Sequence, residues 1–184
     1  MKKIVLFGDS LFNGFRHHRD TDLITTALQE KLGKNAQVKN FSKSGATTVE
    51  GLDFLTQIPQ DTDLVLIEYG TNDSSIVGIS SQNYEKNLEQ MIRFCAPSKV
   101  ILVGPWQDKN GNEYTIPDHL AQNRKIVDKL AHKYHLPQID LLTMRTGEKN
   151  VDKLYQADNL HLTDYGNQKL VELLYHAIKK ELEI

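Results

Sequence analysis

Short runs of apolar residues alternate along the chain with longer stretches in which apolar residues recur at helical spacing. Five runs are predicted to be β-strands: Lys3 to Phe7, Gln37 to Phe41, Leu64 to Glu68, Val100 to Val103 and Gln138 to Asp140. Residues 64–67 and 100–103 are apolar at every position, which is typical of strands covered on both faces. We therefore expect helices on both sides of a parallel sheet.

Five segments between and after these strands carry apolar stripes that are predicted to be buried. The stripes are Leu23, Ile24, Ala27 and Leu28; Val49, Leu52 and Leu55; Tyr84, Leu88, Met91, Ile92 and Cys95; Leu120, Val127, Leu130, Ala131 and Tyr134; and Leu170, Val171, Leu174, Ile178 and Leu182. Thr47 and Thr48 are N-cap candidates for the second helix. The alternation predicts one α/β domain over residues 1–184, a three-layer α/β/α sandwich around a flavodoxin-like five-stranded parallel sheet of order 2-1-3-4-5.

Composition removes several classes of protein. The 184 residues include 22 Lys plus Arg and 24 Asp plus Glu, interspersed along the chain, so we expect no nucleic acid or anionic membrane as partner. A hydrophobic fraction of 39% without any apolar run near 18 residues argues against disorder and against membrane insertion. The first apolar run ends at Gly8, too early for a signal peptide, and the single cysteine excludes an internal disulfide. The expected location is cytoplasmic.

Polar residues of unusual type follow three predicted strands. They are Gly8-Asp9-Ser10 after the first, Ser42-Lys43-Ser44-Gly45 after the second and Gly70-Thr71-Asn72-Asp73 after the third. In the order 2-1-3-4-5 the second and third strands flank the first, so Gly45 and Asn72 approach Ser10 from opposite sides. A hydroxyl between two N–H donors suits acyl transfer, which needs a nucleophile and donors for the oxyanion. Glycine at position 45 is expected to let the substrate come close to the backbone.

A serine nucleophile also needs a base. Among seven histidines, only His161 has a carboxylate at a short spacing just before a predicted helix. Asp158 can hold one ring nitrogen while the other faces Ser10, and Asn159 tolerates the positive φ that such a turn requires. The segment follows the fifth strand, so it can fold back over the same edge of the sheet.

These residues resemble the motifs of the SGNH hydrolases, also called GDSL lipases and esterases. The motifs are Gly8-Asp9-Ser10-Leu11 with Gly14, Asn40 with Ser44-Gly45, Gly70-Thr71-Asn72-Asp73, and Asp158 and His161 followed by Leu162 and Gly166. The resemblance implies a flavodoxin-like fold with Ser10, Asp158 and His161 as catalytic residues. It also implies an oxyanion hole made by Ser10, Gly45 and Asn72. Ser42 and Asn159 stand where the family often has glycine, which concerns local loop geometry.

The expected function is hydrolysis of small soluble or short-chain carboxylic esters through an acyl-enzyme on Ser10, with no cofactor and no metal. Thioesters stay open as substrates, and the oligomeric state is unknown. The chain has no long apolar lid segment, which favours small substrates. Candidate pocket-wall residues are Leu11, Phe12, Tyr69, Ile76 and Trp106, with a polar excursion from Gln107 to Thr115 near the mouth.

Two other functions fit parts of the pattern. A metal-dependent phosphoesterase would use Asp9, Asn72, Asp73, Asp158 and His161 as ligands. A non-enzymatic flavodoxin-like module would bind a ligand with the same loops. Three remaining features have structural explanations: His132 and His135 end a helix, Arg16 to Arg19 form a solvated loop, and Cys95 is a buried apolar residue.

Overall fold

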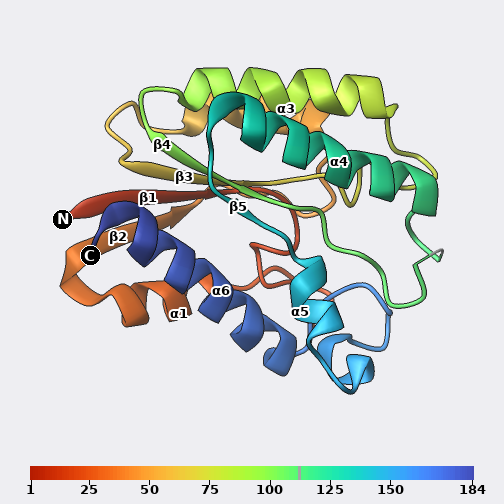
Figure 1. Ribbon diagram of the computed structural model, residues 1–184. Helices are drawn as coiled ribbons and strands as arrows, with labels where there is room; N and C mark the ends of the chain where they lie inside the picture. Colours follow the sequence, from red (N-terminus) through yellow and green to blue (C-terminus); the bar gives the residue numbers. More distant parts are fainter. Residues whose placement is uncertain (112) are drawn as a thin grey trace.

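A five-stranded parallel sheet forms the middle layer of the molecule (Figure 1). The computed structural model describes residues 1–111 and 113–184. The strands are β1 (Lys2–Phe7), β2 (Ala36–Asn40), β3 (Leu64–Glu68), β4 (Lys99–Val103) and β5 (Gln138–Ile139), in the spatial order β2-β1-β3-β4-β5. The predicted order 2-1-3-4-5 is confirmed, whereas Phe41 and Asp140 lie just outside the strands to which they were assigned.

Helices cover both faces of the sheet, as the sequence predicts (Figure 1). One face carries α1 (Leu23–Leu32) and α6 (Asp164–Leu182). The other carries α2 (Thr48–Phe54), α3 (Ser81–Cys95) and α4 (Pro117–Tyr134). The short α5 (Leu142–Thr146) follows β5, and 3-10 turns occur at Gly33–Asn35, Leu55–Gln57 and Val151–Leu154. No helix of the described residues has the length and apolar character needed to cross a membrane.

Both faces of the central strands are covered by helices, which explains the runs of apolar residues in their sequences. In β3, Leu64 and Leu66 contribute to the core beneath α1 and α6, while Val65 and Ile67 contribute to the core beneath α2, α3 and α4. Successive side chains of a strand point to opposite faces, so a strand covered on both sides has no solvent-facing position. Parallel register places Phe7 beside Ile67, which brings the carboxyl ends of β1 and β3 to the same edge.

The helix boundaries follow local capping chemistry. Thr47 is the N-cap of α2 and forms a capping box with Glu50, so one of the two candidate caps is confirmed. Helix α4 ends at Tyr134, as predicted for His132 and His135, and His135 follows in the left-handed conformation. Cys95 is 3% exposed, and burial raises the pKa of its thiol to about 12, in agreement with a buried apolar role.

One predicted apolar stripe is wrong in part. Val49 is 46% exposed, whereas Thr48 and Gly51 of α2 are buried. A Cβ atom at position 51 would lie 2.5 Å from the terminal methyl of Met91 and 2.9 Å from the ring of Tyr69. The helix therefore packs closely through Gly51, and this contact turns Val49 towards solvent.

Candidate active site

Ser10, His161 and Asp158 form one hydrogen-bonded chain at the carboxyl edge of the sheet. Ser10 lies in the turn that follows β1, and His161 lies just before the N-cap of α6. The Ser10 hydroxyl is 3.1 Å from Nε2 of His161, and Nδ1 of His161 is 2.7 Å from Oδ2 of Asp158. An imidazole with a carboxylate on one nitrogen and a hydroxyl on the other can take the hydroxyl proton.

Backbone groups of the turn from Asp158 to His161 hold the Asp158 carboxylate in place, independently of its bond to the imidazole. The backbone N–H groups of Leu160 and His161 both donate to Oδ1 of Asp158, at 3.0 Å each. Asn159 has a φ of 58°, so the expected positive φ is confirmed. Partial burial disfavours the charge on Asp158, but these N–H groups and His161 outweigh it and lower the pKa of the carboxyl. Asp158 is therefore ionised at neutral pH and leaves Oδ2 free to bind the imidazole.

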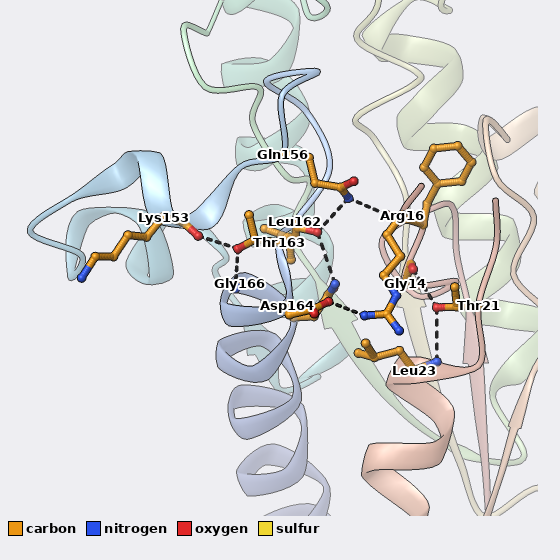
Figure 2. Close-up of polar contacts among 12 residues, drawn as sticks. Gly14, Arg16, Thr21, Leu23, Lys153, Gln156, Leu162, Thr163, Asp164 and Gly166 are labelled. Atoms are coloured by element: carbon orange, nitrogen blue, oxygen red, sulfur yellow. Dashed lines mark hydrogen bonds and ion pairs between the residues drawn. The ribbon is translucent and has the colours of Figure 1, made fainter. Parts of the chain in front are cut away.

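Gln156 joins the turn of His161 to the loop that follows Ser10, and Figure 2 shows its contact with Leu162. Its side-chain amide donates to the carbonyl oxygens of Phe15 and Leu162, both at 2.8 Å. Phe15 in turn places its ring 4.3 Å from the His161 ring, centroid to centroid. The two loops are separated by about 150 residues in sequence, so this amide helps to keep the imidazole over the hydroxyl. Sequence reasoning missed Gln156, because a side chain that bridges two backbone carbonyls carries no motif.

Arg16 makes a second connection between the same segments. Its guanidinium forms an ion pair with Asp164 in the first turn of α6 (Figure 2). His17, His18 and Arg19 are exposed, so the predicted solvated loop is confirmed for these three residues. The prediction is wrong for Arg16, because its long side chain reaches back to α6 and becomes partly buried.

The side chain of Asn72 lies beside the nucleophile turn. Its Nδ2 donates to Oδ2 of Asp9 at 2.8 Å and to the carbonyl oxygen of Ala46 at 2.9 Å. Asp9 also accepts from the N–H of Leu11 at 2.9 Å, so this carboxylate connects the turn after β1 with the loop after β3. The amide of Asn72 is thus held between the loops that follow β1 and β2, as the predicted strand order requires.

Gly45 lies in the loop after β2, in a left-handed conformation with a φ of 78°. A Cβ atom there would meet no other atom within 4 Å. The left-handed backbone conformation by itself favours glycine at this position, and the open space around it leaves room for a substrate to come close to the backbone, as expected from the sequence. Asn13 ties this loop to the nucleophile turn, since its Nδ2 is 3.1 Å from Oγ of Ser44 and 3.4 Å from the carbonyl oxygen of Ser42.

Three buried carboxyl groups lie beneath this edge. Burial is the largest cause of the raised pKa of Asp9, Glu68 and Asp73, and the pKa of Asp73 reaches about 6. Glu68 is fully buried, its Oε1 has no hydrogen-bond partner, and the neighbouring Asp9 carboxyl raises its pKa further. Burial and the neighbouring Asp9 carboxyl thus both favour the protonated form of Glu68.

A small pocket and a wider groove lie next to the triad. The pocket measures about 20 Å³ and is lined by Asp9, Ser10, Leu11, Phe15, Thr71, Asn72, Trp106, Leu160, His161, Leu162 and Asn167. The groove measures about 540 Å³ and is lined by Arg16, His17, Lys153, Gln156, Leu162, Thr163, Asp164 and Tyr165; Figure 2 shows part of this wall. Leu162 borders both spaces.

The expected pocket wall is only partly correct. Leu11 and Trp106 line the small pocket. Phe12 and Tyr69 are buried in the two cores, where Tyr69 meets Phe7 edge to face, and Ile76 is 79% exposed. A position just after a strand does not by itself predict a pocket-lining side chain. At some of these positions the side chain packs into the core, and at others it faces solvent. Position 112 of the expected polar excursion lies outside the described residues.

The residues proposed for a phosphoesterase metal site fall into separate networks. Asp73 accepts from the backbone and hydroxyl of Thr48, whereas Asp9 accepts from Asn72 and Leu11. Asp158 binds His161. Within residues 1–111 and 113–184, no group of three or more His, Cys, Asp or Glu side chains is arranged to hold a metal ion.

Comparison with known proteins identifies the family of the chain. The model of the GDSL-like lipase/acylhydrolase family matches residues 6–169. The chain belongs to this family. The matched range contains Ser10, Gly45, Asn72, Asp158 and His161. As a GDSL-like acylhydrolase, the protein is a carboxylic ester hydrolase.

Solved structures with the same fold match nearly the full length of the chain. A lipase/acylhydrolase from Enterococcus faecalis is 29% identical, with a TM-score of 0.90, and the match covers 98% of this chain and 97% of that one. TesA is 24% identical, with a TM-score of 0.79 and coverage of 97% and 99%. An acetyl xylan esterase, AlAXEase, is 21% identical, with a TM-score of 0.78 and coverage of 96% and 99%. No curated protein sequence gives a significant match.

Proposed function

We propose that this GDSL-like acylhydrolase cleaves short-chain carboxylic esters through an acyl-enzyme on Ser10. The observation that carries the proposal is the chain of contacts from the Ser10 hydroxyl to Nε2 of His161 at 3.1 Å and from Nδ1 to Asp158 at 2.7 Å. Each distance lies within hydrogen-bonding range, so a proton can leave Ser10 while Asp158 stabilises the imidazolium that forms.

The reaction has two steps, acylation of Ser10 and hydrolysis of the acyl-enzyme, and His161 transfers the proton in both. The Ser10 oxygen attacks the ester carbonyl carbon while His161 takes the hydroxyl proton, and a tetrahedral intermediate forms. The C–O bond to the alcohol then breaks, and His161 gives its proton to the leaving oxygen. Water attacks the acyl-enzyme with His161 again as base, and the proton returns to Ser10 as the carboxylic acid leaves.

The oxyanion is assigned to three donors, the N–H groups of Ser10 and Gly45 and the side-chain amide of Asn72. Within the described residues, the N–H groups of Ser10 and Gly45 donate to no backbone acceptor, which leaves them available to a substrate oxygen. Removing one donor of an oxyanion hole typically slows turnover by about 10²–10³-fold. Asn72→Ala is therefore expected to reduce kcat at least a hundredfold.

We assign the acyl group to the small pocket and the alcohol to the wider groove. The pocket volume of about 20 Å³ suits a group of the size of acetyl, since one water-sized probe takes about 10–15 Å³. The groove of about 540 Å³ lies in the size range of ordinary ligand sites and shares the wall residue Leu162. Small acyl esters of bulkier alcohols are the substrate class that this difference favours, and thioesters of small acids fit the same chemistry.

Covalent trapping tests the nucleophile. Diethyl p-nitrophenyl phosphate phosphorylates an activated serine, so we expect loss of activity together with the added mass on the peptide that contains Ser10. The variant Ser10→Ala is the matched control and should stay unlabelled. Labelling of another residue, or equal labelling of both proteins, would contradict the assignment of Ser10.

A series of p-nitrophenyl esters from acetate to palmitate tests the substrate class. We expect kcat/KM to be highest for acetate or propionate and to fall steeply with longer chains, because the pocket beside Ser10 accepts only a few carbon atoms. A maximum at a long chain would overturn the short-chain proposal while leaving the nucleophile assignment intact.

A further inference from the structure

We propose that Tyr114 is a positioning residue of the oxyanion hole, and that its hydroxyl orients the side-chain amide of Asn72 towards the developing oxyanion. Tyr114 lies in the loop between β4 and α4 and belongs to none of the four family motifs. The inference rests on the proposed function, because it assumes that Asn72 stabilises the oxyanion formed at Ser10.

The hydrogen bonds of Asn72 define which way its amide faces. Tyr114 donates its hydroxyl proton to Oδ1 of Asn72 at 2.8 Å. On the opposite side, Nδ2 donates to Oδ2 of Asp9 at 2.8 Å and to the carbonyl oxygen of Ala46 at 2.9 Å. A flipped amide would place Oδ1 against two acceptors and Nδ2 against a hydroxyl. Tyr114 and Asp9 therefore select the same orientation from opposite sides.

Tyr114 can act only as a donor to Asn72 while it remains protonated. Partial burial, reinforced by the charge of Asp9, raises the pKa of its hydroxyl above the ordinary tyrosine value. The phenol thus keeps its proton throughout the neutral range. Its proton polarises the Asn72 carbonyl, which makes the N–H groups of the same amide stronger donors.

The loop that carries Tyr114 is held from below by Asp108. This carboxylate is 1% exposed, and it accepts the N–H groups of Glu113 and Tyr114 at 2.8 and 3.1 Å and the Thr115 hydroxyl at 2.6 Å. Burial opposes its charge, but these donors lower the pKa of Asp108, so it is ionised at neutral pH. The Tyr114 backbone is therefore anchored independently of Asn72, as a positioning group requires.

Both hydrogens of the Asn72 amide already have acceptors in the free protein. An oxyanion must therefore share the hydrogen that points to the carbonyl of Ala46 or to Asp9. Asp9 and Ala46 are each 2% exposed, but the Ala46 carbonyl belongs to the loop of Gly45, the other oxyanion donor. We therefore assign the oxyanion to the Asn72 hydrogen that points to the carbonyl oxygen of Ala46, while Asp9 and Tyr114 hold the plane of the amide.

The test removes the hydroxyl and keeps the ring. With p-nitrophenyl acetate, we expect Tyr114→Phe to lower kcat about tenfold and to change KM less than about twofold, because the lost hydrogen bond matters most in the transition state. Tyr134→Phe, on α4 and bonded to Glu89, is the matched control with unchanged kinetics. An unchanged kcat in Tyr114→Phe, with its thermal unfolding midpoint preserved, would overturn the inference.

A double-mutant cycle separates this inference from the proposed function. In an Asn72→Ala background, Tyr114→Phe should cause no further loss, because the amide that it positions is gone. An equal additional loss in that background would assign the effect of Tyr114 to something other than Asn72. If Asn72→Ala itself retains the full kcat, the proposed oxyanion hole fails. If Asn72→Ala lowers kcat but Tyr114→Phe does not, the positioning role of Tyr114 is wrong while the proposed oxyanion hole stands.

Discussion

Asp63 and Asp73 lie just before and just after β3, at opposite edges of the sheet, and their carboxyl groups meet opposite environments. Asp63 is half-exposed and accepts the backbone N–H of Lys3 at 2.7 Å. This hydrogen bond and the nearby Lys2 ammonium lower its pKa. Asp73 is fully buried, and burial raises its pKa to about 6, although Thr48 donates to it twice.

The contrast shows what each edge of the sheet contributes. At the amino edge, charged groups stay near water and connect strands, as when Asp63 donates its own N–H to the carbonyl of Lys3. At the carboxyl edge, Asp9, Glu68 and Asp73 are buried together, and Oε1 of Glu68 and Oδ2 of Asp73 have no partner. Such buried, incompletely paired carboxyls lower stability. Of the three, Asp9 binds the side-chain amide of Asn72, a proposed oxyanion donor beside Ser10.

The largest expected effect concerns the function of the carboxyl edge. Asp158→Asn should lower kcat by about 10³–10⁴-fold, because the amide cannot hold His161 in the tautomer that accepts the Ser10 proton. The free energy of unfolding should change by less than about 1 kcal/mol, since Asp158 lies at the surface. Steady-state kinetics and urea unfolding measure the two quantities. A kcat within tenfold of the wild type would contradict the role of Asp158.

A smaller effect concerns the stability of the same edge. Between about pH 4, the ordinary aspartate range, and pH 6, folded Asp73 keeps a proton that the unfolded chain releases, so the free energy of unfolding falls as the pH rises through this window. The fall due to this residue is about 3 kcal/mol. Asp73→Asn should remove it in urea titrations at several pH values. A variant with the same pH slope as the wild type would show that Asp73 ionises normally.

The smallest effect concerns the amino edge and has the opposite sign. The lowered pKa of Asp63 contributes stability that is present above the ordinary aspartate range and is lost as the pH falls. Asp63→Asn should therefore lower the free energy of unfolding at pH 7 by no more than about 1 kcal/mol, because the group is partly screened by water. The same titrations measure it. A loss well above about 1 kcal/mol, or a gain in stability at pH 7, would contradict this account of the amino edge.

The fold could be predicted because its signals are local and repeated. Residues 64–67 are apolar at each position because both faces of β3 are covered, and this pattern predicts buried parallel strands without knowledge of their neighbours. Val49 shows the limit of such reasoning. Its exposure depends on how closely Gly51 approaches Tyr69 and Met91, which is a tertiary contact that periodicity does not contain.

The candidate site was predictable where residues follow strands or precede helices. Ser10, Asn72 and His161 occupy such positions, and the strand order alone brings the first two together. Gln156 and Tyr114 were not predictable, because their side chains act on groups 141 and 42 residues away, respectively, with no characteristic spacing. Sequence patterns thus identify the groups proposed for chemistry, whereas the groups that position them emerge only from tertiary structure.

The most direct test of the account compares the wild type with Ser10→Ala in the hydrolysis of p-nitrophenyl acetate, with a chelator present in both assays. The account predicts turnover in the wild type and a loss of at least about 10³-fold in the variant, whose fold should be preserved because only one hydroxyl is removed. Equal activity of the two proteins, or loss of wild-type activity on addition of the chelator, would contradict a metal-free serine mechanism centred on Ser10.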